Sequence, residues 1–280
     1  MREALEQAWE GPGTDVRYQF TRSLEDAGDK ARRAADDGTD IVLACGGDGT
    51  VSEIGRALIG TETTLGVLPA GSGNGFARHF EIPLGPARAA LALADGRSVR
   101  IDVGTLNGRP FLVTCSIAWD AALVRSFEKM PVRGILPYVF AGVQEFFQYK
   151  PQPVEATLDT GERLRFPAPL VFTMANLSEY GGGAKIAPHA RADDGKIELV
   201  VVRHQDVPSL LGNLGLCFAG KLRGVPGVVS RSVSSLTLSR RKATPVQMDG
   251  ELTDAPTNLT VTTLPKALRI LVPRRSKGAA

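Results

Sequence analysis

The sequence predicts two domains of different class: an N-terminal α/β domain with a Rossmann-like parallel sheet, followed by a C-terminal β-sandwich. Three observations support this. The first hundred residues alternate between helical and strand-like stretches, which is typical of a parallel sheet flanked by helices. Two of these strands end in glycine-rich loops. After Gly96 the pattern changes to many short strands separated by Gly, Pro, Asn and Asp, which is typical of sandwiches and partly open barrels.

The N-terminal elements are predicted from composition and apolar runs. An Ala-, Arg- and Asp-rich stretch that stops at Gly38 indicates a surface helix. Two short, continuous apolar runs indicate buried strands of a parallel sheet, and each is followed by a glycine-rich loop and a helical stretch. We therefore expect helices over 24–37, 51–59, 76–80 and 86–94, and strands over 41–45 and 65–68.

The C-terminal elements are mainly short strands. We expect strands over 99–103, 110–116, 154–158, 170–175, 197–203, 232–238, 245–248, 259–263 and 268–273, with helices near 134–148 and 207–222. The change of pattern places the domain boundary at residues 97 and 98, which gives domains of 1–97 and 98–280. The C-terminal tail is expected to return to the first domain.

Composition limits the class of protein. With 43% hydrophobic and 22% charged residues, the 280-residue chain is neither disordered nor fibrous. A net charge of +3 is too small to indicate a nucleic-acid partner. The three cysteines form no CxxC pair, so they indicate neither a zinc site nor a disulfide framework, and each is expected to be a buried thiol. No apolar run approaches the roughly 20 residues that span a bilayer. We expect a cytoplasmic protein that meets a membrane at most peripherally, at its inner face.

Two glycine-rich loops carry the first chemical signal. Gly46-Gly47-Asp48-Gly49-Thr50 and Gly71-Ser72-Gly73-Asn74 each follow a buried strand and precede a helix. Ligands of open parallel sheets bind at the carboxyl ends of the strands, where backbone N–H groups and helix N-termini favour phosphate. An Asp within a phosphate-binding loop is unfavourable unless a cation compensates its charge. Asp48 therefore points to a magnesium-bound nucleotide.

Other familiar nucleotide and metal motifs are absent from the sequence. There is no GxxxxGK[ST] segment, and Phe76 replaces the last glycine of a GxGxxG pattern. There is no HExxH segment either, and His79, His189 and His204 show no metal-ligand spacing. We expect structural or surface roles for these three histidines.

Three clusters in the second half complete the set of candidates. The first runs from Asn176 to Gly183, the second from Pro188 to Lys196, and the third contains Asp249-Gly250-Glu251. Two carboxylates spaced two residues apart on a strand share a face, so one could accept a hydroxyl proton while the other positions it. A solvated Asp-Gly hairpin turn is the structural alternative.

Together, these segments resemble the catalytic region of diacylglycerol, sphingosine and ceramide kinases and their bacterial relatives. The resemblance rests on five segments in the order seen in that family and covers nearly the whole chain, from about Thr14 to about Pro273. These segments are GGDGT at 46–50, PAGSGNGFAR at 69–78, YGGG at 180–183, DG at 194–195 and DGE at 249–251. The resemblance implies an ATP- and Mg²⁺-dependent lipid kinase with an NAD kinase-like or diacylglycerol kinase-like nucleotide domain and a lipid-substrate sandwich.

The resemblance also implies roles for individual residues. Asp249 would be the general base, with Glu251 beside it and Asp48 on the metal side, although sphingosine-kinase-like members assign the base to the residue matching Asp48. The Asp194 side chain and the backbone carbonyls of Arg191 and Lys196 would hold a structural Mg²⁺. The nucleotide or its Mg²⁺ would contact Gly46, Gly47, Asp48, Gly49, Thr50, Gly71, Ser72, Gly73 and Asn74.

The sequence departs from the family pattern in two places. The family's opening strand and its Asn-Pro-x-Ser/Ala-Gly loop have no counterpart ahead of the first helix, so we expect either a truncated or misassigned start or the loss of a phosphate-contacting element. Gly75 stands where many bacterial diacylglycerol kinases carry Asp, which leaves the lipid substrate open.

Two other functions and one assembly stay open at this point. A kinase of a soluble substrate such as NAD is one alternative, although no Asn-Glu pair of the kind expected in NAD kinases occurs. A non-catalytic relative that binds lipid or nucleotide is the other. The expected partners are ATP and a lipid at a membrane surface, and the sequence leaves a homodimer open.

Overall fold

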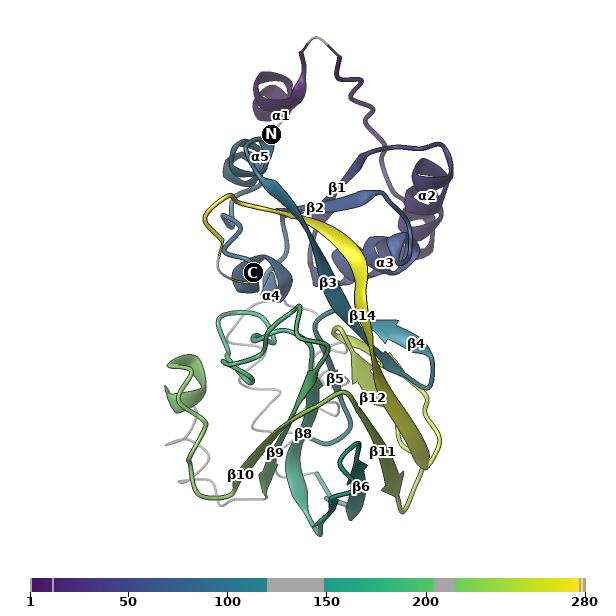
Figure 1. The fold of residues 1–280 in the computed structure, drawn as a ribbon, viewed down its shortest axis with the longest axis vertical. Coiled ribbons are helices and arrows are strands. Elements are labelled where there is room, and N and C mark those ends of the chain that lie inside the picture. The colour runs from purple at the N-terminus through teal and green to yellow at the C-terminus, as the bar shows by residue number, and fades with distance from the viewer. Residues whose placement is uncertain (1, 12, 120–148, 204–214, 277, 279–280) are drawn as a thin grey trace.

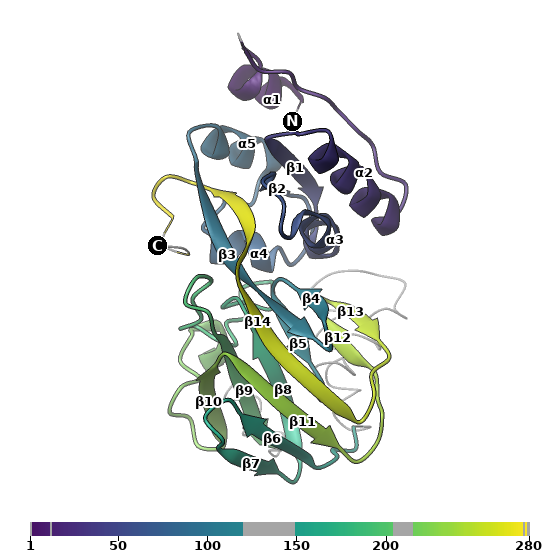
Figure 2. The same ribbon diagram turned by 45° about the vertical axis from the view of Figure 1, so that its right-hand side comes forward.

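The computed structural model describes residues 2–11, 13–119, 149–203, 215–276 and 278. Figure 1 shows the labelled helices gathered in one half of an elongated molecule and an antiparallel sandwich in the other. The turned view in Figure 2 shows the same division, with two long strands running from the sandwich into the helical half. The expected fold class, an α/β domain joined to a β-sandwich, is therefore confirmed.

The N-terminal half is a small parallel sheet covered by helices. Strands β1 and β2 pair in parallel, with Ile41 opposite Thr64 and Gly46 opposite Pro69. Ser23 caps α2, because its Oγ accepts a hydrogen bond from the N–H of Asp26 at 3.1 Å. The elements are α1 (Arg2–Trp9), α2 (Leu24–Asp36), β1 (Ile41–Gly46), α3 (Asp48–Leu58), β2 (Thr64–Pro69), α4 (Gly75–His79) and α5 (Pro86–Ala94).

The C-terminal half contains two sheets packed face to face. Within the described residues one sheet continues β1 and β2 of the N-terminal half and has the order β1-β2-β14-β11-β6-β7, with β3 paired to β14 and β4 paired to β3. The other sheet has the order β10-β9-β8-β5-β12-β13. The strands are β3 (Arg97–Leu106), β4 (Arg109–Phe111), β5 (Thr114–Ser116), β6 (Val154–Leu158), β7 (Arg163–Phe166), β8 (Pro169–Ala175), β9 (Ile197–Arg203), β10 (Val228–Val233), β11 (Ser235–Arg240), β12 (Val246–Met248), β13 (Glu251–Thr253) and β14 (Asn258–Val272).

Strands β3 and β14 connect the two halves. They pair with each other along most of their length, and Ile270 of β14 also pairs in parallel with Leu65 of β2. The yellow strand in Figures 1 and 2 shows this path from the sandwich into the helical half. Each of the two strands contributes side chains to both main hydrophobic cores. A boundary at residues 97 and 98 stays a prediction, because β3 begins at Arg97 and then runs through both halves.

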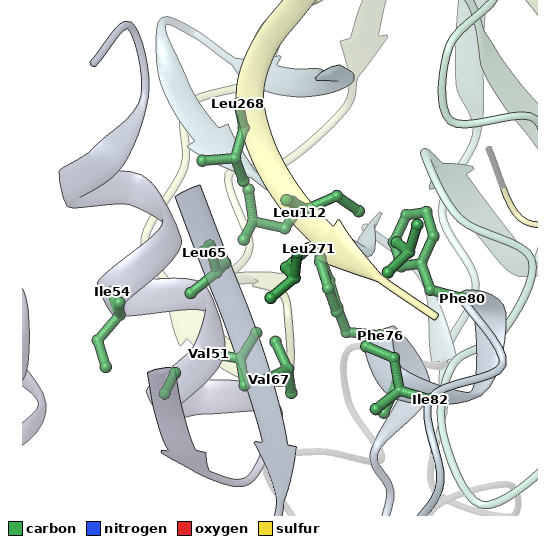
Figure 3. Packing of buried hydrophobic residues seen from close by; sticks show 14 of the residues in the cluster. Val51, Ile54, Leu65, Val67, Phe76, Phe80, Ile82, Leu112, Leu268 and Leu271 are labelled. Carbon is green, nitrogen blue, oxygen red and sulfur yellow. The ribbon is translucent and has the colours of Figure 1, made fainter. Parts of the chain in front are cut away.

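The N-terminal core lies between β2, α3, α4 and the end of β14. Figure 3 shows Leu65 and Val67 of β2 among Val51, Phe76 and Leu271. Every residue of β2 is buried, which explains its continuous apolar run. Strand β1 is only partly buried, since within the described residues it pairs with β2 alone.

Several predicted elements differ from the structure in extent. The single strand expected over 110–116 is two strands, β4 and β5, that belong to different sheets, and the strand expected over 232–238 is likewise divided between β10 and β11. The two strands expected over 259–263 and 268–273 form one strand, with an irregularity between Leu264 and Leu268. Pro265 lies in that irregularity, where the lack of an N–H can be accommodated.

Other expectations were incomplete or lie outside the described residues. Helix α1 and strands β7 and β13 were not predicted. The thiol of Cys45 is exposed because it lies on the partly covered strand β1, so the prediction that all three cysteines are buried was wrong. The helix expected near 134–148 lies outside the described residues, as does the first part of the one expected over 207–222. None of the helices in the described part of the chain is long and apolar enough to cross a membrane.

Candidate active site

The first glycine-rich loop joins β1 directly to α3. Gly47 is the N-cap of α3 and Asp48 is its first residue, so the helix begins three residues earlier than the sequence predicted. A Cβ on Gly46 would lie 2.7 Å from the Cβ of Thr50, closer than side chains approach one another. The loop is therefore tightly folded back on the first turn of the helix, where unpaired backbone N–H groups favour an anion.

The second glycine-rich loop lies directly against the first. A Cβ on Gly71 would lie only 2.5 Å from the Cα of Gly47, so the two backbones meet without any side chain between them. Asn74 holds this loop in shape: its Oδ1 accepts from the N–H of Gly71 at 3.0 Å and its Nδ2 donates to the Gly71 carbonyl at 2.8 Å. Asn74 has a φ of 51°, a conformation that Asn adopts more readily than most residues. Its amide group therefore shapes the loop from within.

The third glycine-rich loop comes from the C-terminal half and completes the cluster. Gly181, Gly182 and Gly183 all have positive φ, which explains three glycines in a row. The N–H of Gly182 donates to the carbonyl of Gly73 at 2.9 Å. A Cβ on Gly75 would lie 3.1 Å from the backbone nitrogen of Gly181. Loops from both halves of the chain thus meet.

Asp48 lies where the three loops meet. Its Oδ1 accepts from the N–H of Phe76 at 3.2 Å, and a Cβ on Gly73 would lie 3.0 Å from its Oδ2. Burial raises the pKa of the Asp48 carboxyl above its usual value. The N–H groups of Gly75 and Phe76 counteract this rise, and the negative charge of Asp249 adds to it. A carboxylate in this environment is stabilised by a cation.

Asp249 lies in the turn between β12 and β13, and its side chain is fully buried. Its Oδ1 accepts from the N–H groups of Val113 at 2.7 Å and Thr114 at 3.2 Å. Its Oδ2 accepts from the N–H of Leu112 at 2.8 Å and from Nη2 of Arg56 at 3.3 Å. A carboxylate has about four lone-pair positions. Four donors therefore surround the side chain that the family resemblance marks as the general base.

Arg56 links α3 to both carboxylates of the Asp249–Glu251 turn. Its Nη1 lies 3.4 Å from Oε2 of Glu251 and 3.2 Å from Oε2 of Glu53, and its Nε donates to the carbonyl of Pro110 at 3.1 Å. Asp249 and Gly250 both have positive φ, so the turn is also the Asp-Gly hairpin that the sequence left as an alternative. Oε1 of Glu251 lies 3.8 Å from the position of a Cβ on Gly49. The turn therefore sits against the first glycine-rich loop.

The predicted metal turn at 191–196 is held by a residue that the sequence analysis missed. Oδ2 of Asp102, a fully buried side chain, accepts from the N–H of Gly195 at 2.6 Å, and its Oδ1 accepts from the N–H of Lys266 at 2.8 Å. Asp194 is exposed and its Oδ1 accepts from the N–H of Lys196 at 3.1 Å. No group of three or more His, Cys, Asp or Glu side chains suited to a metal ion occurs in the described part of the chain.

Two further ionisable residues, Glu179 and His79, lie close to the loops. Glu179 is buried, and burial raises its pKa, against the opposing effect of Lys185 and Arg78. His79 is half-buried on α4, where its Nδ1 accepts from the N–H of Ser178 at 3.1 Å and its Nε2 donates to the carbonyl of Gly278 at 3.2 Å. The expectation of a structural role for His79 agrees with these bonds. Arg56 was not among the candidates from the sequence. Its only signal there is a charged residue between the small residues Gly55 and Ala57, which the structure shows to be buried in α3.

Comparisons with known proteins show which family this chain belongs to. The model of the diacylglycerol kinase catalytic domain matches residues 2–106, and the model of the YegS C-terminal NAD kinase beta sandwich-like domain matches residues 114–272. A curated probable lipid kinase YegS-like of Chromohalobacter salexigens is 34% identical over 209 residues, which are 72% of this chain and 62% of the relative. This chain therefore aligns with less than two thirds of that relative's length. A diacylglycerol kinase of Mycobacterium tuberculosis is 29% identical over 276 residues, covering 94% of this chain and 86% of the relative.

Solved structures show the same fold. A diacylglycerol kinase from Bacillus anthracis str. Sterne superposes with a TM-score of 0.72 at 20% identity, over 96% of this chain and 88% of that one. An NAD kinase from Archaeoglobus fulgidus in complex with ATP superposes with a TM-score of 0.53 at 13% identity, over 98% of this chain and 89% of that one. The two family models match consecutive parts of the chain, the first over the glycine-rich loops of the N-terminal half and the second over the Asp-Gly-Glu turn. This chain therefore belongs to the family of diacylglycerol kinase-like lipid kinases, in which a diacylglycerol kinase catalytic domain precedes a YegS-type sandwich.

Proposed function

We propose that this chain is an ATP- and Mg²⁺-dependent lipid kinase that transfers a phosphoryl group to a hydroxyl of diacylglycerol or a related lipid. The observation that carries the proposal is the meeting of three glycine-rich loops around the Asp48 carboxylate. The loops contribute backbone N–H groups and a helix N-terminus, and a Cβ on Gly71 would lie only 2.5 Å from the Cα of Gly47. Such a backbone surface suits phosphate oxygens, since no side chain keeps them at a distance.

The nucleotide would lie on the first two loops. Residues Gly46 to Thr50 and Gly71 to Gly73 would face its phosphates, while Asn74 would keep the second loop in shape through its bonds to Gly71. Asp48 would hold Mg²⁺, because its burial and the nearby charge of Asp249 favour a cation at this carboxylate. When bound, Mg²⁺ would neutralise negative charge on the transferred phosphoryl group.

A second, structural Mg²⁺ at the 191–196 turn is part of the proposal. Asp194 is exposed and Asp102 holds the turn from beneath through the N–H of Gly195. Since no cluster of three ligand side chains surrounds the turn in the described residues, the carbonyl groups of Arg191 and Lys196 would supply further ligands.

A lipid as acceptor is supported by the relatives. The curated relatives named above are a probable lipid kinase and a diacylglycerol kinase. Within the site, the Asp249–Glu251 turn brings carboxylates to the first loop, where a hydroxyl group could lose its proton. We propose that the protein meets its lipid from the cytoplasm, at the inner face of the membrane.

A panel assay tests the proposed function. The chain is incubated with Mg-ATP and, in separate reactions, with diacylglycerol, sphingosine, ceramide or NAD, and mass spectrometry identifies the products. We expect a phosphorylated lipid, formed at least about a hundredfold more slowly by the Asp48→Asn variant. Phosphorylation of NAD alone would instead indicate a kinase of a soluble substrate. Absence of every product, together with no calorimetric binding of Mg-ATP, would indicate a non-catalytic relative.

A further inference from the structure

Asp249 and Glu251 differ sharply in how they are held, although they belong to the same turn. Both oxygens of Asp249 accept backbone N–H groups, from Leu112, Val113 and Thr114, and its side chain is fully buried. Protonating this carboxylate would leave at least one of these buried donors without an acceptor, which is costly. The bonds instead fix the segment in which the chain crosses from β4 to β5.

Glu251 has the opposite character. Its side chain is 30% exposed, and Arg56 contacts only its Oε2. Among the described residues no hydrogen bond reaches Oε1, which faces Gly49 in the first turn of α3. This oxygen is therefore available to accept a proton beside the loop that would hold the phosphates.

Arg56 contacts both carboxylates through different nitrogens. Its Nη2 lies 3.3 Å from Oδ2 of Asp249 and its Nη1 lies 3.4 Å from Oε2 of Glu251. A planar guanidinium presents its donors in a fixed arrangement, so it sets the position of one acceptor relative to the other. The carbonyl of Pro110 fixes the guanidinium in turn by accepting from Nε.

We propose that Arg56 is a positioning residue that gives the two carboxylates different roles: Asp249 is a buried anion that organises the backbone, and Glu251 is the proton acceptor. The inference rests on the proposed function and deepens it. In the reaction, the O–H bond of the lipid hydroxyl breaks and its proton moves to Oε1 of Glu251. The hydroxyl oxygen forms a bond to the γ-phosphorus of ATP, and the bond from that phosphorus to the bridging oxygen breaks, which releases ADP.

Matched variants of the full chain test this division. Glu251→Gln is compared with Glu53→Gln, because Glu53 also contacts Nη1 of Arg56 and its side chain is 31% exposed. Steady-state kinetics with Mg-ATP and the lipid acceptor, and urea denaturation, are measured for each. Glu251→Gln should lower kcat by about 10²- to 10⁴-fold, the usual contribution of a general base, with little change in the KM for ATP or in the urea midpoint. Glu53→Gln should leave kcat within about threefold of wild type, because Arg56 keeps its contacts with Asp249, Glu251 and Pro110.

Asp249→Asn and variants at Arg56 complete the test. Asp249→Asn should lower the urea midpoint clearly, because its amide turns donors towards buried N–H groups. Arg56→Met should lower kcat with little change in the KM for ATP, Arg56→Lys should restore part of it, and Arg56→Met should cost much less in the Glu251→Gln background. A wild-type kcat in Glu251→Gln, or fully multiplicative effects of the two substitutions, would overturn the inference. Failure of the proposed function would show separately, as a wild-type chain that forms no phospholipid.

Discussion

The backbone N–H of Phe76 donates a hydrogen bond to Oδ1 of Asp48 at 3.2 Å, and this bond joins the two glycine-rich loops of the N-terminal half. Phe76 lies in α4 and Asp48 begins α3, so the first turn of α4 is directed at the carboxylate that begins α3. The N-terminus of α4 therefore faces the Asp48 carboxylate, whose pKa is raised by burial and also by the charge of the buried Asp249.

Asp48→Asn is expected to separate function from stability. The amide oxygen can still accept from Phe76, while the negative charge is lost. Because burial and the charge of Asp249 disfavour ionised Asp48, the variant should unfold at the same urea concentration as wild type or at a higher one. Phosphoryl transfer should fall by at least about a hundredfold, the scale expected for a positioned charged group. A decrease in phosphoryl transfer that only matches a decrease in the amount of folded protein would contradict this prediction.

Gly71→Ala should disturb the contact between the first two loops. The new Cβ would lie 2.5 Å from the Cα of Gly47, and a backbone atom cannot move aside as a side chain can. We expect a loss of about 1–3 kcal/mol in the free energy of unfolding, as for other overpacked positions, and weaker Mg-ATP binding by calorimetry. Gly85→Ala is the control, since nothing lies within 4 Å of its Cβ position. Equal effects of the two substitutions would rule out the explanation.

Asp102→Ala should destabilise the protein through two backbone groups. The N–H groups of Gly195 and Lys266 would lose a buried acceptor, which costs on the order of 3 kcal/mol together. Urea denaturation measures the loss, and faster hydrogen exchange at both amides locates it. The control is Asp95→Ala, because the exposed pair of Asp95 and Arg274 should contribute under about 1 kcal/mol. Unchanged exchange at Gly195 would show that Asp102 does not hold the turn.

His79 should make stability depend on pH. Burial lowers its pKa from 6.5 to about 4, so the folded state binds a proton less readily than the unfolded chain. Stability contributed by neutral His79 is therefore complete above pH 6.5 and is lost as the pH falls from about 6.5 towards 4, by about 1.4 kcal/mol per unit of pKa shift. A proton added at Nδ1 would also oppose the N–H of Ser178.

The measurement is the free energy of unfolding at a series of pH values. His79→Gln should flatten the profile between pH 4 and 6.5, whereas replacement of the exposed His189 by Gln should leave it unchanged. The same slope in His79→Gln as in wild type would assign the pH dependence to other groups.

Local signals in the sequence were sufficient for much of the fold. The apolar runs at β1 and β2, the glycine breaks after them and the alternating pattern of later strands were each readable in isolation. The predicted strands were wrong where one continuous run of residues is divided between two sheets, as at β4 and β5. The β-propensity of a segment does not indicate which strand it will pair with. The bulge of β14 was read as a break for a related reason: Lys266, next to Pro265, is held by Asp102, more than 150 residues earlier in the chain.

What the sequence provided by itself is the set of segments that we propose carry the chemistry. Glycines that permit close backbone contact, and carboxylates placed within or beside them, can be recognised because each requirement is met by a short segment. Only the tertiary structure decided how Asp249 and Glu251 differ. Their surroundings are built from Arg56 and from the backbone of Leu112 to Thr114, far away in sequence, and hydrogen-bond partners and burial depend on packing in three dimensions.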